Sequence, residues 1–406
     1  MLRQTVAAFF CASCLLIARQ SASNNALNEA WRLAGSGQSE QAIHLLQKLV
    51  VGSPHNADAL LLLGSLLMEK GDRSGSIAQL TAAVRLRPQS AEAQNALGEA
   101  YNRFGDAKSA RGPFEKAVAL QPAFAQAQVN LGLVLLTANE LPAAAGHLKR
   151  AVLLLKNTAD AAYPLYLLAK VYSAQNDTQE AAEQLEKAVL LDPRMPEAWS
   201  DLGRARKELL NENGAIAAFE HAVELNPDDA VAQYRLGTAY LDADRLVPSI
   251  EHLRQAYRLN PRDQSTLNSL QIALRQAGRN TEADEVKQQL TALIRAKDEA
   301  SQNDVKAVAL NNEGAGLQKS GDLRAALEKY RAALNLNPGN VGIRVNYAVA
   351  LLRLGQWTPG LNELHEALAR DPENATIRAA LSDAMRQAPP GTVPKWDDKG
   401  SNDGRP

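Results

Sequence analysis

The sequence predicts an all-α solenoid built from pairs of antiparallel helices, and three observations support this prediction. Prolines recur at intervals of 34 residues, and the same residue types recur at fixed distances from each of them. The chain is 46% apolar but only 5% aromatic, which is typical of a folded helical protein and not of a disordered one. The recurring prolines are Pro54, Pro88, Pro122, Pro193, Pro227, Pro261, Pro338 and Pro372.

Two intervals between these prolines are longer and hide one repeat each. Pro122 and Pro193 are 71 residues apart, and Pro261 and Pro338 are 77 apart. One further repeat of 34 residues in each interval leaves three extra residues in the first and nine in the second, at 298–306. We therefore expect about ten repeats, because a fixed period over most of a chain indicates a repeat architecture.

The first helix of each repeat is predicted from three positions, counted so that the proline is position 32. Position 7 is usually leucine, position 8 is usually glycine and position 11 is large, as in Leu97, Gly98 and Tyr101. These positions share one face of a helix, because residues three and four apart are neighbours. Glycine at position 8 lets a second helix approach closely.

The second helix is predicted from positions 20, 24 and 27, which are small, bulky and usually alanine. Ala110, Phe114 and Ala117 show the pattern in the third repeat. A turn such as Gly71-Asp72 separates the two helices, since glycine ends helices and aspartate caps them. Proline at position 32 ends the second helix by forcing its predecessor out of the α region.

This pattern resembles that of tetratricopeptide repeat proteins, from about residue 23 to residue 387. The resemblance implies a right-handed superhelix of about ten 34-residue helix-turn-helix repeats with a C-terminal capping helix. It also implies a concave groove, lined by the first helices, that binds peptides or partner helices. Several units depart from the pattern and are expected to pack less well. The departures are Glu29 and Ala30 in repeat 1, Gln271 and Lys287 in repeat 8, Glu313 in repeat 9 and Gly360 in repeat 10.

The first 23 residues have the features of a secretory signal peptide. Arg3 precedes an uncharged stretch that ends at Arg19, and small residues follow. We expect export to a periplasmic or secreted location in a cell envelope, with a short membrane anchor as the alternative. Both cysteines, Cys11 and Cys14, lie in this leader, so the rest of the chain cannot form a disulfide.

The remaining chain divides into a solenoid, an insertion and a tail. We expect one long helix where the insertion follows repeat 8, and a disordered tail whose Trp396 is either without a role or a short docking element. The predicted segments are repeats 1–8 at 24–297, the insertion at 298–306, repeats 9 and 10 at 307–374, the capping helix at 375–387 and the tail at 388–406.

Several function classes are disfavoured by the sequence. The 44 basic and 45 acidic residues leave a net charge of −1, which argues against binding to nucleic acid through counterion release. No nucleotide-binding, metalloprotease or nucleophile-elbow motif occurs in the repeats, and the six histidines are spread over distant repeats. We therefore predict a protein that is not an enzyme and that has no cofactor and no metal site.

Candidate binding residues come from the exposed positions of the first helices. Repeats 5 to 7 combine tyrosine with lysine and arginine. Tyrosine and arginine are enriched in binding hot spots. In some members of the family, asparagines at position 6 bind a peptide backbone, and the resemblance implies the same role for those of the adjacent repeats 9 and 10. The basic clamp with which some members of the family hold chaperone C-termini is absent. The candidates are Tyr163, Tyr166, Lys170, Ser200, Arg204, Lys207, Tyr234, Asn312 and Asn346.

The sequence as a whole predicts a non-catalytic scaffold or adaptor that binds other proteins or peptides in its groove. Two alternatives remain open. The protein could be a structural spacer or self-assembling array, or an auxiliary subunit that positions a separate enzyme or a secretion or assembly machine. A membrane contact is expected only through an uncleaved leader, and the sequence does not indicate the oligomeric state.

Overall fold

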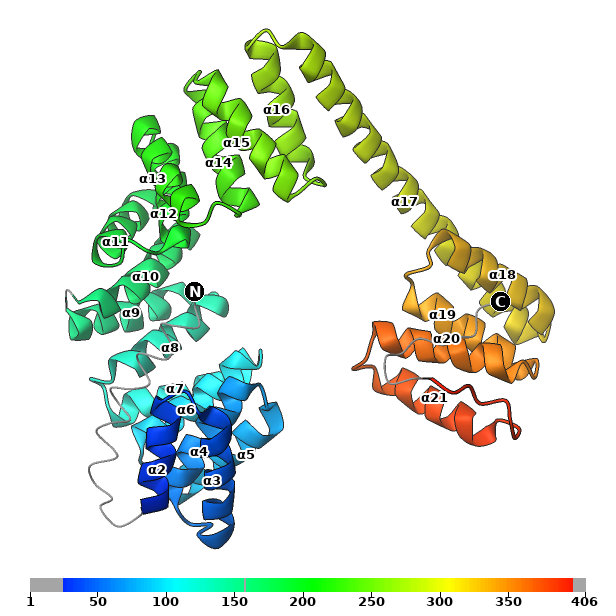
Figure 1. Cartoon of the computed structure of the whole chain (residues 1–406), viewed down its shortest axis with the longest axis horizontal. Helices are drawn as coiled ribbons and strands as arrows, with labels where there is room; N and C mark the ends of the chain where they lie inside the picture. The colour runs from blue at the N-terminus through cyan, green and yellow to red at the C-terminus, as the bar shows by residue number, and fades with distance from the viewer. Residues whose placement is uncertain (1–24, 157, 397–406) are drawn as a thin grey trace. The chain divides into compact units, whose positions relative to one another are not determined.

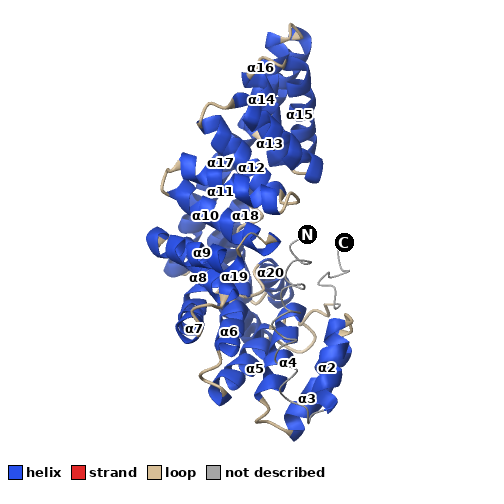
Figure 2. Ribbon diagram, turned by 90° about the vertical axis from the view of Figure 1, so that its left-hand side faces the viewer, coloured by secondary structure: helices blue, strands red, loops and turns tan. Residues whose placement is uncertain are grey.

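A computed structural model describes residues 25–156 and 158–396 of the chain. Within these residues the protein forms twenty α-helices and one short 3-10 helix, and no strand (Figure 2). The leader and the last ten residues lie outside the described residues. The prediction of an all-α solenoid is therefore confirmed for the described part of the chain.

Successive helices pair as the repeat pattern predicts, each first helix packing on the second helix that follows it (Figure 1). The first helices of repeats 1 to 8 are α2 (Asn25–Gly35), α4 (Ala57–Lys70), α6 (Ala91–Arg103), α8 (Ala125–Thr137), α10 (Ala162–Ala174), α12 (Pro196–Glu208), α14 (Ala230–Asp242) and α16 (Gln264–Gln276). The second helices of repeats 1 to 7 are α3 (Ser39–Gly52), α5 (Arg73–Leu86), α7 (Ala107–Leu120), α9 (Leu141–Leu155), α11 (Thr178–Leu191), α13 (Glu212–Leu225) and α15 (Leu246–Leu259). The 3-10 helix Ala159–Ala161 contains part of the three-residue insertion before α10.

Repeats 8 and 9 share one helix, α17 (Asn280–Ser320), which is 41 residues long. It contains the second helix of repeat 8, the insertion at 298–306 and the first helix of repeat 9. The expected long helix is present and extends further than expected, because no glycine or proline interrupts it before Gly314. The helices that follow are α18 (Leu323–Leu336), α19 (Val341–Arg353), α20 (Trp357–Arg370) and α21 (Ala375–Gln387).

The chain divides into two compact units, residues 1–261 and 262–406. Repeats 1 to 7 belong to the first unit, and α16 to α21 belong to the second. The boundary between the units therefore follows Pro261, whereas the segment 298–306, at which we divided the solenoid, lies inside α17 in the second unit.

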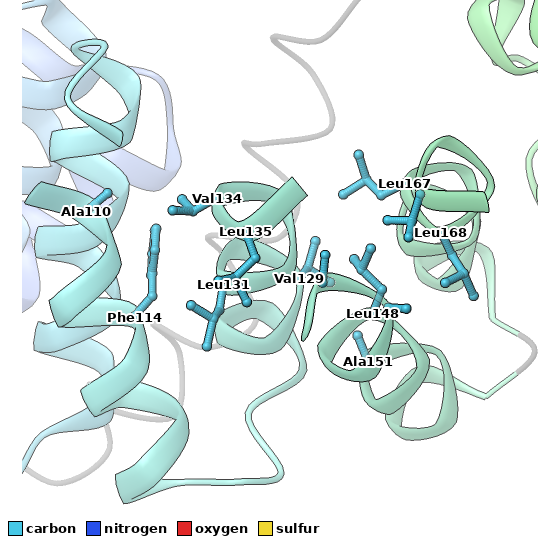
Figure 3. Packing of buried hydrophobic residues seen from close by; sticks show 13 residues of the cluster. Ala110, Phe114, Val129, Leu131, Val134, Leu135, Leu148, Ala151, Leu167 and Leu168 are labelled. Atoms are coloured by element: carbon cyan, nitrogen blue, oxygen red, sulfur yellow. The ribbon is translucent and has the colours of Figure 1, made fainter. Parts of the chain in front are cut away.

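Close packing inside each repeat joins position 8 to position 24. A Cβ added to Gly98 would lie 2.6 Å from ring carbons of Phe114, and one added to Gly132 would lie 2.7 Å from Cγ of Leu148. Phe114 and Leu148 are almost fully buried, in a cluster that spans repeats 3 to 5 (Figure 3). The helices can therefore approach this closely only because position 8 has no side chain, which confirms the register predicted from the sequence.

In repeat 10 the glycine and the alanine exchange places between the two helices, and the close approach is kept. Ala348 stands at position 8, and Gly360 stands at position 20 where other repeats have alanine or serine. A Cβ added to Gly360 would lie 2.7 Å from Cγ of Leu352. The expectation of looser packing at Gly360 is therefore wrong, because the two helices still meet at a glycine.

Several links between repeats are fixed by a side chain at position 4 of the first helix. In repeats 4, 6 and 7 this side chain donates to the carbonyl of the preceding proline, from Gln128 at 2.9 Å, from Trp199 at 2.8 Å and from Gln233 at 2.8 Å. These prolines lie just beyond the preceding helix, so their carbonyls have no partner in its hydrogen-bond ladder. The shared geometry therefore satisfies one such group and fixes the turn, although the residue types differ.

The turn between paired helices requires a left-handed residue at position 15, and Leu210 and Asp244 are the two exceptions to the usual choice. Glycine or asparagine occupies this position in eight repeats, including Gly71 and Asn176, while Leu210 has a φ of 60° and is 87% exposed. A left-handed conformation costs a residue with a Cβ about 1–2 kcal/mol. Leucine at this turn is therefore strained without burying its side chain.

Leu210→Gly is expected to stabilise the protein by about 1 kcal/mol, because glycine adopts the left-handed conformation without that cost. Urea unfolding followed by circular dichroism measures the change. Gly71→Leu places the same strain on a turn of repeat 2 and should lower stability by a similar amount. Equal stability of Leu210→Gly and the wild type would contradict the assignment of strain.

Residues 388–396 correct the prediction of a disordered tail over 388–406. The indole of Trp396 stacks on the ring of His365, with 4.4 Å between the centroids, and its Nε1 donates to Oδ1 of Asn362 at 3.1 Å. Thr358 of α20 donates through Oγ1 to the carbonyl of Thr392 at 2.8 Å. The tail thus gains both apolar contact and hydrogen bonds, and its tryptophan docks on a second helix of the protein's own C-terminal repeat.

Candidate partner-binding surface

The first helices form one continuous surface within the first unit. First helices of successive repeats contact each other, as α4 does with α6 and α12 with α14, and second helices do so less. The solenoid is therefore tightest along the first helices, which places them on its inner side. Seven of the predicted residues lie on these helices, and all of them except the buried Ser200 are at least partly exposed: Tyr163, Tyr166 and Lys170 on α10, Ser200, Arg204 and Lys207 on α12, and Tyr234 on α14.

Three of these residues gather on α10. The rings of Tyr163 and Tyr166 lie 6.5 Å apart, and Nζ of Lys170 lies 5.4 Å from the centre of the Tyr166 ring. Tyr163 remains 41% exposed. Burial raises the pKa of Tyr166, and the nearby carboxylates of Asp201 and Glu197 raise it further. The phenol of Tyr166 therefore stays protonated, and its hydroxyl is already engaged with the carboxylate of Asp201.

The cations of this surface already have acidic partners in the chain. Asp201 lies between Lys170 and Arg204, with an N–O distance of 3.8 Å to each. Arg204 also donates to Glu208 at 3.0 Å, and Lys207 lies 2.6 Å from Asp242. An acidic group of a partner would have to compete with these carboxylates.

A second set of contacts joins position 5 of one repeat to position 6 of the next. Arg235 donates to Oγ of Ser200 at 2.7 Å, so Ser200 is held by the neighbouring repeat. Asn346 on α19 donates to Oδ1 of Asn311 at 2.9 Å, and Asn312 points its exposed side chain elsewhere on α17. The structure thus pairs Asn346 with Asn311, the neighbour of the predicted Asn312. Position 5 of one repeat and position 6 of the next are 35 residues apart in both pairs, and this separation can be recognised in the sequence.

Sequence reasoning missed a polar cluster around Glu99, which lies on the same surface in repeats 3 and 4. Oε1 of Glu99 on α6 accepts from Asn95 at 3.0 Å and from Asn130 of α8 at 2.9 Å. Asn130 also donates to Oδ1 of Asn95 at 3.0 Å, and Gln126 donates to Oδ1 of Asn130 at 3.1 Å. Burial raises the pKa of Glu99, and the bonds from Asn130 and Asn95 offset part of that rise.

Glu99→Gln is expected to stabilise the protein at neutral pH and to change its stability little at about pH 4. Because the pKa of Glu99 is raised, the folded protein holds the carboxyl proton more tightly than the unfolded chain does. The stability that Glu99 contributes is therefore present below about pH 4.3, the usual pKa of glutamic acid, and is lost as the pH rises towards the raised value.

Thermal melting at about pH 4 and about pH 8, on either side of the usual pKa, tests this expectation. The matched control is Glu92→Gln on the same helix. An equal effect of Glu99→Gln at both pH values would contradict it.

Residues 25–156 and 158–396 contain neither a cluster of metal-ligating side chains nor a helix that could span a membrane. No three histidine, cysteine, aspartate or glutamate side chains in these ranges are grouped so that they could hold a metal ion. No helix in them combines the length and the apolar character that crossing a bilayer requires.

Models of the tetratricopeptide repeat match most of the chain. One matches residues 27–72, 63–123, 108–164, 166–206 and 213–264. Two others match residues 196–229 and 317–384. The matched ranges follow the helix pairs of the structure in both units.

Curated relatives match parts of the chain. The anaphase-promoting complex subunit CDC16 of Saccharomyces cerevisiae is 23% identical over 227 residues, which cover 55% of this chain and 26% of CDC16. The peroxisomal targeting signal receptor of Candida albicans is 26% identical over 226 residues, which cover 47% of this chain and 38% of the receptor. The matches therefore span less than half the length of these two relatives.

Among solved structures, PilF of Pseudomonas aeruginosa is similar to this chain at 19% sequence identity. The similarity covers 52% of this chain and 95% of PilF, with a TM-score of 0.48.

Proposed function

Because the chain belongs to the tetratricopeptide repeat family, we propose that it is a non-catalytic scaffold whose first helices bind an extended segment of a partner protein. The observation that carries the proposal is the cluster of Tyr163, Tyr166 and Lys170 on the first helix α10, in which Tyr163 and Lys170 are exposed and Tyr166 is partly buried. One relative is named as a subunit of a complex and the other as a receptor for a targeting signal, which supports a role in protein binding.

The chemistry of this surface favours a mostly uncharged partner segment. The tyrosine rings offer apolar area to an aromatic or aliphatic side chain, and the hydroxyl of the exposed Tyr163 offers a hydrogen bond. Because Asp201 and Asp242 already balance the nearby cations, added acidic groups on the partner would gain little. Binding through this cluster should therefore depend only weakly on salt.

Photo-crosslinking tests the proposal directly. A photoreactive phenylalanine analogue at Tyr163 should capture a partner protein, and the same analogue at Leu190 should not. Leu190 is 79% exposed on the second helix α11, so it is a control of similar accessibility on the other layer. Capture at Leu190 but not at Tyr163 would contradict binding along the first helices.

We also propose that the protein is exported to a cell envelope, with residues 1–23 as a cleaved signal peptide. The support is the basic Arg3 before an uncharged stretch, followed by small residues up to Ser23. The mass of the intact protein from its native source tests this. A chain that begins at Asn24 is expected, and a chain that retains the leader in a membrane fraction would favour the anchor.

A further inference from the structure

Glu99 is a partly buried carboxyl group whose hydrogen-bond partners are all neutral. Asn95 and Asn130 both donate to its Oε1. Within residues 25–156 and 158–396, no lysine, arginine or histidine forms an ion pair with Glu99. Oε2 is therefore left without a cation or a hydrogen-bond donor of the described chain.

The contrast with Asp201, on the same surface, shows that this arrangement is specific to repeats 3 and 4. Asp201 lies between the two cations Lys170 and Arg204. Glu99 instead accepts from two amides at one oxygen, and amides fix the position of a carboxylate without neutralising it. A carboxylate in a partly buried site gains most from a cation that arrives with a ligand, because the cation offsets its loss of hydration.

We propose that Glu99 binds the ammonium or guanidinium group of a lysine or arginine side chain in the partner segment. The inference rests on the proposed function, and it adds the chemistry of one residue of the ligand. Asn95 and Asn130 hold Oε1 in place, so that Oε2 is presented to the incoming cation. Gln126 holds the amide of Asn130 in turn.

The positions of the residues around Glu99 support its role as a site for a basic side chain. Its members come from two helices that pack against each other, α6 and α8. Asn95 is only 5% exposed, so its position is set by the core and not by solvent. Glu99 itself keeps intermediate exposure, so a side chain can reach it. The carboxylate is therefore prepositioned, and a long basic side chain is the partner that can reach it and form charge-assisted hydrogen bonds.

The test uses positional peptide libraries, in which acetylated octapeptides carry one fixed residue at one position and mixtures elsewhere. The wild-type protein is expected to prefer lysine or arginine over norleucine at one position, by roughly tenfold, which is typical of a charge-assisted hydrogen bond. Glu99→Gln should lose this preference and keep any preference for aromatic residues at other positions. That retained preference shows that the variant is folded. Glu92→Gln, on the same helix, should behave as the wild type.

Three results would overturn the inference, and they separate it from the proposed function. Peptide binding without a basic preference would leave the groove as a binding surface and remove the role of Glu99. A basic preference that persists in Glu99→Gln would assign the cation to another carboxylate. No binding of any library would contradict both the inference and the peptide-binding groove.

Discussion

Gly98→Leu is expected to destabilise the protein by about 1–3 kcal/mol, or more if the helices cannot move apart. Even a single added Cβ would lie 2.6 Å from ring carbons of Phe114, and Phe114 is 1% exposed. A leucine side chain would have to separate α6 from α7 or force Phe114 out of the core. Thermal and urea unfolding measure the loss.

Two further variants show whether the loss comes from this contact. Gly146→Ala on α9 adds a Cβ that meets nothing within 4 Å, so it should stabilise the helix by about 0.5–1 kcal/mol. Gly98→Leu combined with Phe114→Ala should lose less stability than the sum of the two changes, because the leucine then fills the space of the ring. An unchanged melting temperature of Gly98→Leu would mean that the register of repeat 3 is wrong.

Spin labels at Glu285 and Ser320 of α17 are expected to lie about 50 Å apart, because an α-helix rises 1.5 Å per residue. The labels are attached to the Glu285→Cys and Ser320→Cys variant, with Cys11 and Cys14 replaced by serine. Pulsed electron–electron double resonance should give one narrow distribution of distances between the two labels. A much shorter distance would show that the chain folds back within 298–306.

Ala300→Pro is expected to broaden this distribution strongly. Proline in a helix interior costs about 3 kcal/mol or more, and the side chains from Ile294 to Gln302 are exposed and offer no packing that would hold the helix straight. Labels at Gln302 and Ser320 form a matched control, since both lie beyond the proline. Their separation of about 27 Å should stay narrow in the presence of Ala300→Pro.

The repeat fold could be predicted from the sequence because close helix contacts restrict residue size. Gly98 and Phe114 show this, since only glycine allows the ring to lie where it does. The length of α17 was harder to predict. The insertion contains no residue that breaks a helix, but no sequence pattern shows that repeats 8 and 9 would share one helix and not two.

The candidate surface was predicted only in part, because contacts between repeats join residues far apart in the chain. The cluster of Tyr163, Tyr166 and Lys170 follows from helical spacing within α10. Glu99 was missed because a single glutamate on a helix is normally solvated, and its environment depends on Asn130 in the next repeat. Trp396 was placed in a disordered tail because its partner, His365, lies 31 residues earlier.

Affinity capture from native lysate, followed by mass spectrometry, tests most directly whether the first helices form the working surface. Three baits are compared: the wild type, a groove variant and a control variant. The groove variant carries Tyr166→Ala, Arg204→Glu and Tyr234→Ala on first helices. The control variant makes similar changes at exposed positions of second helices, with Leu153→Ala, Lys187→Glu and Leu190→Ala.

Melting curves must first show that both variants fold, since Arg204→Glu also removes an ion pair with Glu208. The account predicts a partner that is captured by the wild type and the control variant and is lost with the groove variant. A partner that is retained by the groove variant and lost with the control variant would contradict the account and place the working surface on the second helices.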